Sequence, residues 1–111
     1  MNISIKGTNM SLTPSVKQYV NEKIGNLGKF IVATDAKVEL ERDKHHKSGQ
    51  VFRAEVMLIV GGKVMRGETR AEDVYAAIDL VIPKIKDQIG KFKDKKQTLT
   101  RRGARSAKRK N

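Results

Sequence analysis

Apolar side chains are concentrated in the first 90 residues of this 111-residue chain, so a hydrophobic core can form only there. Of the 42 apolar residues, 38 precede Gly90, whereas residues 91–111 carry +9 of the net charge of +12. From about Lys95 onward the segment cannot bury enough surface to offset the entropy of ordering it. The sequence therefore predicts one domain over 1–95 and a basic, disordered tail over 96–111 that becomes ordered on meeting phosphate. A tail that only increases solubility is the alternative.

The composition excludes several classes of function. The chain has no cysteine, which rules out disulfides, thiol nucleophiles and cysteine-based zinc sites. The longest apolar run, 56–60, is far shorter than the roughly 18 residues of a membrane helix, and the N-terminus has no signal-peptide pattern. We therefore expect a soluble, cytoplasmic protein with no membrane contact and no cofactor. The excess of Lys and Arg predicts a polyanionic partner such as nucleic acid.

The first half of the domain changes from a strand pattern to a helix pattern and back. Residues 2–6 alternate between apolar and polar side chains, which predicts a strand. Thr13 is a favourable N-cap and Pro14 suits the first helical position, so the apolar residues that follow at spacings of three and four predict an amphipathic helix ending near Gly28. Residues 36–41 alternate again and predict a second strand with one solvent-exposed face.

The second half of the domain begins with a predicted hairpin. The apolar segment 50–60 is followed by Gly61-Gly62, which can adopt the positive φ angles of a two-residue turn, and then by the alternating segment 63–70. This turn predicts a register in which apolar or small residues oppose each other: Leu58 with Met65, Val56 with Gly67, and Ala54 with Thr69. The other side of the hairpin is largely charged and carries Arg66 and Arg70.

A second helix is predicted from Ala71 onward by apolar residues three or four positions apart: Val74, Ile78, Val81, Ile85, Ile89 and Phe92. Its lysines fall in two rows beside this stripe, one with Lys84, Lys91 and Lys95 and the other with Lys86 and Lys93. Such rows can follow a phosphate backbone, and a merely solvated helix face is the alternative. The complete pattern predicts an α+β fold of order β-α-β-β-β-α, a four-stranded sheet with two helices packed on one face. Its last five elements have the topology of double-stranded-RNA-binding domains.

Particular residues in this framework resemble a known family, the ribosome hibernation-promoting factors and ribosome-associated inhibitors. The second helix carries the resemblance through residues 72–81, Glu-Asp-Val-Tyr-Ala-Ala-Ile-Asp-Leu-Val, followed by Lys84, Gln88-Ile89 and Lys91. The opening is similar too, with an Ile-x-Ile strand, a Gly-Thr-Asn-Met step, Leu12-Thr13-Pro14, and a helix ending in Leu27-x-Lys29-Phe30. The similarity covers roughly residues 1–95. Asp87, Val74 and Pro83 depart from the residues that the family usually has at these positions.

The resemblance implies a non-catalytic stationary-phase and stress-response factor that binds the small ribosomal subunit between head and body. There it would occupy the space of mRNA and tRNA and inhibit translation. The resemblance is to the short form, which has no second domain, so pairing of ribosomes through such a domain is not expected. Off the ribosome we expect a monomer. Carried over by position, the family's RNA-contacting cations are Lys23 and Lys29 near the first helix and Lys84, Lys91 and Lys95 on the second.

Lysines and arginines of the helix flanks, the sheet face and the tail make up the predicted RNA-binding set. Its members are Lys23, Lys29, Arg66, Arg70, Lys84, Lys86, Lys91, Lys93, Lys95, Arg101 and Arg102. No metal site is expected, because the adjacent His45 and His46 of the basic loop would point in opposite directions on a strand.

Two other classes of function are alternatives to this interpretation. Gly61-Gly62-Lys63 is similar to the Gly-Gly-Gln loop of ribosome-rescue hydrolases but lacks the glutamine, so no enzyme activity is expected. A generic RNA-binding or ribosomal structural protein with the double-stranded-RNA-binding topology is the stronger alternative. Competition with mRNA and tRNA separates that class from a factor that occupies the decoding channel.

Overall fold

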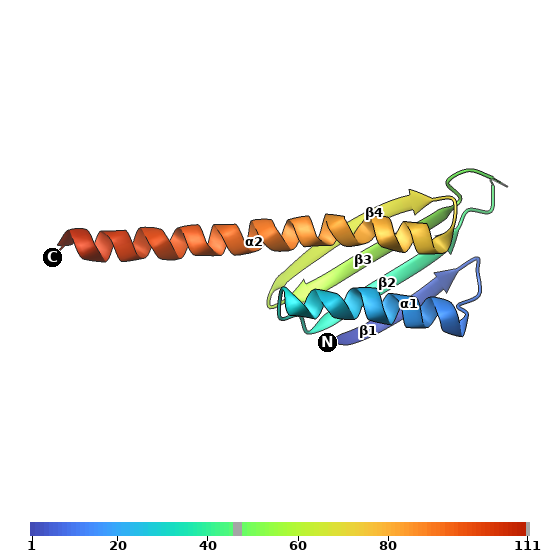
Figure 1. The fold of residues 1–111 in the computed structure, drawn as a ribbon, viewed down its shortest axis with the longest axis horizontal. Coiled ribbons are helices and arrows are strands. Elements are labelled where there is room, and N and C mark those ends of the chain that lie inside the picture. The colour runs from blue at the N-terminus through green and yellow to red at the C-terminus, as the bar shows by residue number, and fades with distance from the viewer. Residues whose placement is uncertain (46–47, 111) are drawn as a thin grey trace.

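The computed structural model describes the backbone of residues 1–45 and 48–110, and the side chains of those up to Asp94. Four strands and two long helices follow one another in the predicted order (Figure 1). Their bounds are β1 Asn2–Thr8, α1 Pro14–Gly25, a 3₁₀ turn η1 Asn26–Lys29, β2 Asp35–Arg42, β3 Phe52–Val60, β4 Lys63–Ala71 and α2 Val74–Lys110. The predicted α+β class is therefore confirmed.

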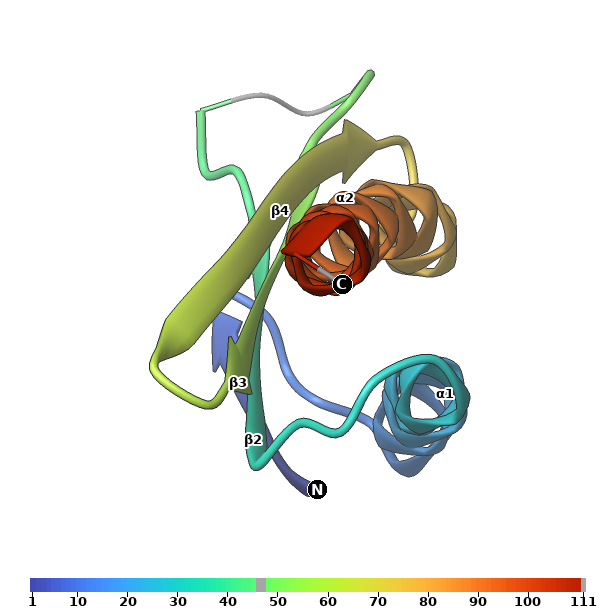
Figure 2. The same ribbon diagram turned by 90° about the vertical axis from the view of Figure 1, so that its left-hand side faces the viewer.

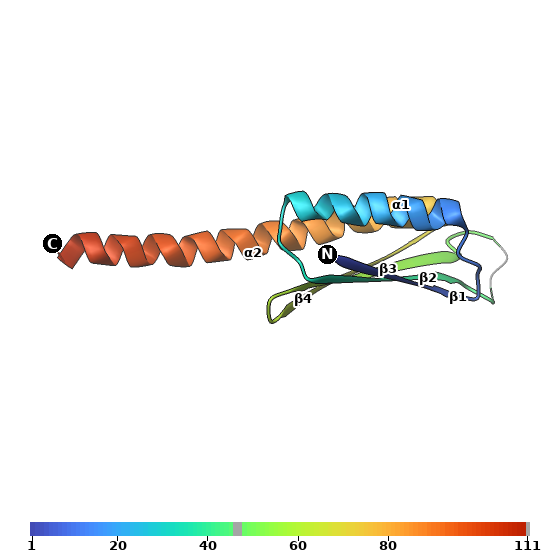
Figure 3. The ribbon, with the colours of Figure 1, turned by 90° about the horizontal axis from the view of Figure 1, so that it is seen from below.

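The four strands form one mixed sheet in the order β1-β2-β3-β4. β1 runs parallel to β2, and the other neighbouring strands are antiparallel. Because parallel neighbours need a crossover connection, the chain returns along the sheet through α1. Both helices cover the same face and leave the opposite face open, as the prediction required (Figures 2 and 3).

The start of α1 follows from its sequence. The Thr13 Oγ1 accepts a hydrogen bond from the Val16 N–H at 3.2 Å, and Pro14 occupies the first helical position, where its missing N–H costs nothing. Val16, Val20 and Ile24 then recur every four residues and are fully buried against the sheet. The sequence thus fixes both the beginning of α1 and the face that it buries.

The hairpin between β3 and β4 has the predicted register, with Leu58 opposite Met65 and Val56 opposite Gly67. In the two-residue turn of this hairpin, Gly61 has a positive φ of 59°, whereas the φ of Gly62 is not in the positive range. One left-handed glycine at the first turn position is typical of a type II′ turn. On the inner face, a Cβ on Gly67 would lie 3.2 Å from the Ile85 Cδ1, so this glycine permits α2 to pack closely on β4.

The bounds of α2 differ from the prediction at both ends. Ala71 still belongs to β4, and α2 begins at Val74 because the Asp73 carboxylate accepts a hydrogen bond from the Ala76 N–H at 2.8 Å. At its other end α2 continues through Lys110, beyond the sheet (Figure 1). Lys, Arg, Gln and Ala favour helix, and extending an existing helix needs no new nucleus. We expect disorder over 96–111 because this segment has no apolar face to bury. That expectation stays a prediction.

Candidate RNA-binding surface

The open face of the sheet is electrically balanced. Strand alternation places five cations and five acids on it: Lys6, Lys37, Arg53, Arg66 and Arg70, and Asp35, Glu39, Glu41, Glu55 and Glu68. Opposite charges at this density largely cancel at a distance, so the middle of the sheet attracts a polyanion only weakly.

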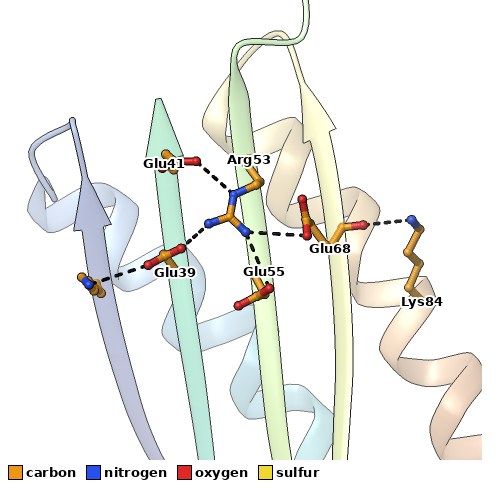
Figure 4. Close-up of polar contacts among 7 residues, drawn as sticks. Glu39, Glu41, Arg53, Glu55, Glu68 and Lys84 are labelled. Atoms are coloured by element: carbon orange, nitrogen blue, oxygen red, sulfur yellow. Dashed lines mark hydrogen bonds and ion pairs between the residues drawn. The ribbon is translucent and has the colours of Figure 1, made fainter. Parts of the chain in front are cut away.

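Arg53 organises the acids on this face (Figure 4). Its guanidinium hydrogen-bonds the carboxylates of Glu39 and Glu41, the latter at 3.1 Å, and lies 3.6 Å from Glu55 and 3.7 Å from Glu68. Burial lowers the pKa of Arg53, but the hydrogen bond to Glu41 and the neighbouring carboxylates outweigh this and raise its pKa above the usual value. Because its side chain is only 14% exposed and surrounded by acids, Arg53 holds strands together and is unavailable to RNA.

On the helix side of the molecule most of the exposed lysines lie at one end. Up to Pro83, α2 contains Asp79 as its one charged residue, whereas exposed lysines predominate from Lys84 onward. That half of α2 lies at the same end of the sheet as η1 and the β3–β4 turn (Figure 1). We call the lysines gathered there the basic pole: Lys29, Lys63, Lys84, Lys86, Lys91 and Lys93.

One flank of α2 is attached to the free edge of β4. The Lys84 Nζ donates to the Glu68 carbonyl at 2.9 Å. Gln88 accepts from the Arg66 N–H at 3.1 Å and donates back to the Arg66 carbonyl. These bonds satisfy edge groups that could otherwise pair with another strand. Lys84 therefore has a structural role beside any role in binding, while Lys91, paired with Asp87 at 3.2 Å, keeps 77% of its side chain exposed.

The other flank of α2 faces η1. The Lys86 Nζ lies 5.0 Å from the centre of the Phe30 ring, a cation–π distance. Lys23, in the last turn of α1, lies similarly 5.4 Å from the centre of the Tyr19 ring. As far as Lys93, the two rows predicted on α2 thus lie on opposite flanks, and one of them shares its surface with Lys29.

Between η1, the β3–β4 turn and α2 the surface contains a hollow of about 680 Å³. Phe30 and Phe92 line it together with Lys29, Lys63 and Lys93. Lys63, Phe30 and Phe92 were not among the residues predicted to bind RNA. The adjacent pairs Lys29-Phe30 and Phe92-Lys93 were the available signal, since a cation beside an aromatic residue is typical of RNA-binding surfaces.

The predicted RNA-binding residues fall into three groups in the structure. Lys29, Lys84, Lys86, Lys91 and Lys93 come together at the basic pole, and Lys23 lies nearby on α1. Arg66 and Arg70 are exposed on the open face of β4, the edge strand beside Lys84. Lys95, Arg101 and Arg102 lie on the part of α2 whose side chains are outside the described residues, so their role stays a prediction.

The described residues lack both a membrane-spanning helix and a three-residue metal cluster. No helix there is long and apolar enough to cross a membrane. Residues 1–45 and 48–94 contain no group of three His, Asp or Glu side chains that could hold a metal ion. Of the two adjacent histidines, His45 donates its backbone N–H to the Asp43 carboxylate at 2.8 Å, and His46 lies outside the described residues.

Curated relatives of this chain are named ribosome hibernation promotion factor. The protein from Bacillus subtilis (strain 168) is 37% identical over 100 residues, which cover 86% of this chain and 50% of the relative. The protein from Picosynechococcus sp. (strain ATCC 27264 / PCC 7002 / PR-6) is 34% identical over 97 residues, with the same two shares covered. The chain thus spans about half the length of the curated relatives it matches.

Solved structures share the fold. The N-terminal domain of Thermus thermophilus Protein Y superimposes with a TM-score of 0.71 at 30% identity, covering 83% of this chain and 99% of that domain. A ribosomal subunit interface protein from Coxiella burnetii gives the same TM-score at 16% identity, covers 85% of this chain and 99% of its own, and supports the fold alone. The family described as Sigma 54 modulation protein / S30EA ribosomal protein matches residues 3–97, so the resemblance seen in the sequence is confirmed and the chain belongs to this family.

Proposed function

We propose that this chain is a ribosome hibernation factor that binds the small ribosomal subunit in the decoding channel. There it would inhibit translation by occupying the space of mRNA and tRNA. The observation that carries the proposal is the basic pole, where six lysines gather on the helix side while the open sheet face stays balanced. The relatives' names point to the ribosome as the partner, and a ribosomal partner implies a cytoplasmic location.

The proposed mechanism is electrostatic attachment followed by steric exclusion. Lysine ammonium groups of the basic pole neutralise phosphates of ribosomal RNA and release their counterions, which requires no particular base sequence. Lys23, the edge residues Arg66 and Arg70, and Lys95, Arg101 and Arg102 of the tail extend this surface. The folded body then fills the tract that the translation substrates need, without any catalytic step.

The experiment that tests this attachment is cosedimentation of the full chain with purified small and large subunits over a series of salt concentrations. About seven phosphate contacts would make the apparent affinity fall with roughly the fifth to sixth power of the salt concentration. We expect this steep dependence with small subunits and weaker retention by large subunits. Equal retention by both subunits would contradict the proposed site.

A charge-matched pair of variants locates the binding surface. Lys86→Gln/Lys93→Gln removes two charges from the basic pole, and Lys6→Gln/Lys37→Gln removes two from the balanced sheet face. Loss of two phosphate contacts should lower the salt exponent by about 1.5 in the first double variant and leave it unchanged in the second. Equal effects in the two variants would show that total charge, and not the basic pole, determines binding.

A further inference from the structure

The hollow at the basic pole has a lining that the attachment of a phosphate backbone does not require. Its walls combine the aromatic rings of Phe30 and Phe92 with aliphatic side chains such as Ile31 and Val60. Phe30 is 43% exposed and the neighbouring Val32 is 88% exposed, so apolar surface is left open to water here. Its volume of about 680 Å³ falls in the range of roughly 300–1,000 Å³ that is typical of sites for small ligands.

The charge around the hollow is of one sign. Among the side chains up to Asp94 that the structure describes, Lys29, Lys63 and Lys93 line it and no acid does. Two smaller hollows adjoin it, one sharing Phe30 and Lys93 and adding Lys86, the other sharing Lys63 and Phe92 and adding Lys91. No acid among the same described side chains lines either of them. On this part of α2 the acids are Asp87, which pairs with Lys91 at 3.2 Å, and Asp94. An occupant should therefore be anionic.

Lysine ammonium groups lie beside both aromatic rings of the hollow. The Lys63 Nζ lies 5.3 Å from the centre of the Phe92 ring, and the Lys86 Nζ lies 5.0 Å from that of Phe30. A ligand that contacts either ring is therefore also close to a lysine ammonium group. On the turn side of the hollow, a Cβ on Gly61 or Gly62 would meet nothing within 4 Å, so the rim is open there.

We propose that this hollow binds one unpaired nucleotide of single-stranded RNA, with its base against Phe30 and Phe92 and its phosphates at the surrounding lysines. A nucleotide joins a flat apolar ring to a negative charge, which is the combination that this lining offers. An acidic peptide could satisfy the charge, but it has no flat face of comparable size unless it carries an aromatic residue. The inference rests on the proposed function, since it names where RNA would be read on the same surface.

The test measures binding of a labelled oligouridylate that carries one photoreactive uridine. Loss of base stacking should weaken binding of Phe30→Ala by about 5- to 150-fold. Leu80→Ala is the matched control, because Leu80 is an exposed apolar residue, 52% accessible, that does not line the hollow. Phe30→Leu keeps apolar contact without an aromatic ring and should also weaken binding. Circular dichroism of each variant checks that the fold is kept, and light-induced cross-links of the wild type should map to Phe30, Phe92 or their neighbours.

Several results would overturn the inference. One is equal affinity of Phe30→Ala and Leu80→Ala for the oligonucleotide, and another is cross-links confined to other surfaces. A third is an acidic peptide with one aromatic residue that binds more tightly than the oligonucleotide and depends on Phe30, which would make the hollow a protein-docking site.

Binding of the same variants to small subunits separates this inference from the proposed function. If the wild type binds subunits but Phe30→Ala does not weaken oligonucleotide binding, only the inference fails. If oligonucleotide binding depends on Phe30 while the wild type does not bind subunits, only the proposed function fails.

Discussion

At the scale of single residues, Arg53 shows how one side chain sets the character of a whole face. Arg53→Ala would leave Glu39, Glu41, Glu55 and Glu68 close together without their shared cation. We expect the variant to lose about 2 kcal/mol of the free energy of unfolding at low salt and less at about 1 M salt, which screens the repulsion between the carboxylates. Urea denaturation at the two salt concentrations measures the loss.

The matched control for Arg53 is Lys37→Ala, which removes an exposed cation from the same face. Its loss should stay within about 0.5 kcal/mol, as for most surface substitutions. An Arg53→Ala loss of the same size at both salt concentrations would show that packing, and not charge repulsion, accounts for it.

Tyr19 provides a second prediction at this scale, based on its contact with α2. Its hydroxyl donates a hydrogen bond to the Asp79 carboxylate, which is the main cause that raises the pKa of Tyr19 from 10.0 to about 12. Folding favours the neutral form, so the associated stability is complete below pH 10 and is lost as the pH rises from about 10 to about 12. Ultraviolet absorbance should therefore show a tyrosinate transition of Tyr19 that is later than the ordinary pKa of 10.0, at about pH 12.

Two acid-to-amide variants test the cause of this shift. Asp79→Asn should move the later transition down towards 10, because the charged acceptor is gone. Glu22→Gln removes an acid with a smaller influence on Tyr19 and should leave the transition nearly in place. A later transition that persists in Asp79→Asn would refute the assignment to this hydrogen bond.

At the scale of elements, the attachment of α2 to β4 depends on Gln88. Gln88→Leu would leave the N–H and carbonyl of Arg66 without their side-chain partner. The expected cost is about 1 kcal/mol of the free energy of unfolding, together with faster hydrogen exchange of the Arg66 amide in NMR spectra. Asp87→Ala changes the adjacent residue and should not alter that exchange, so equal acceleration in the two variants would contradict the proposed contact.

The C-terminal half of α2 is predicted to act in binding and not in folding. Among residues whose side chains are described, buried core positions end at Ile89, so a chain ending at Lys95 should keep its free energy of unfolding within about 0.5 kcal/mol. Its salt exponent for RNA binding should fall by about 0.7 to 0.9 for each phosphate contact that the tail makes. An unchanged exponent would favour a tail that only increases solubility.

The sequence predicts local features of these elements. It does not predict features that depend on contacts between segments far apart in the chain. Gly61 and the alternation around it were enough for the β3–β4 register, and residue spacing was enough for both lysine rows of α2. The cluster around Arg53 could not be predicted, since it depends on the pairing of β2 with β3 across a nine-residue connection that sequence spacing does not determine. The hollow was missed for the same reason, because Phe30, Lys63 and Phe92 come from three separate segments.

At the scale of the whole molecule, the charge distribution and the shape act together. The balanced sheet face attracts a polyanion only weakly, the basic pole attracts it strongly, and the long α2 continues from that pole beyond the sheet (Figure 1). This asymmetry orients the molecule on RNA without base-specific contacts, and the body then excludes whatever else would occupy the same space. A generic RNA-binding protein could have the same charge asymmetry but would not exclude translation substrates.

Displacement is therefore the measurement that tests the central claim most directly. The chain is bound to small subunits at low salt, and mRNA with initiator tRNA is added in increasing amounts before sedimentation. We predict that the added RNAs release the chain from the subunits in proportion to their own occupancy, and that excess chain prevents their binding in turn. Stable binding of all three to the same subunit would contradict steric exclusion and favour a general RNA-binding role.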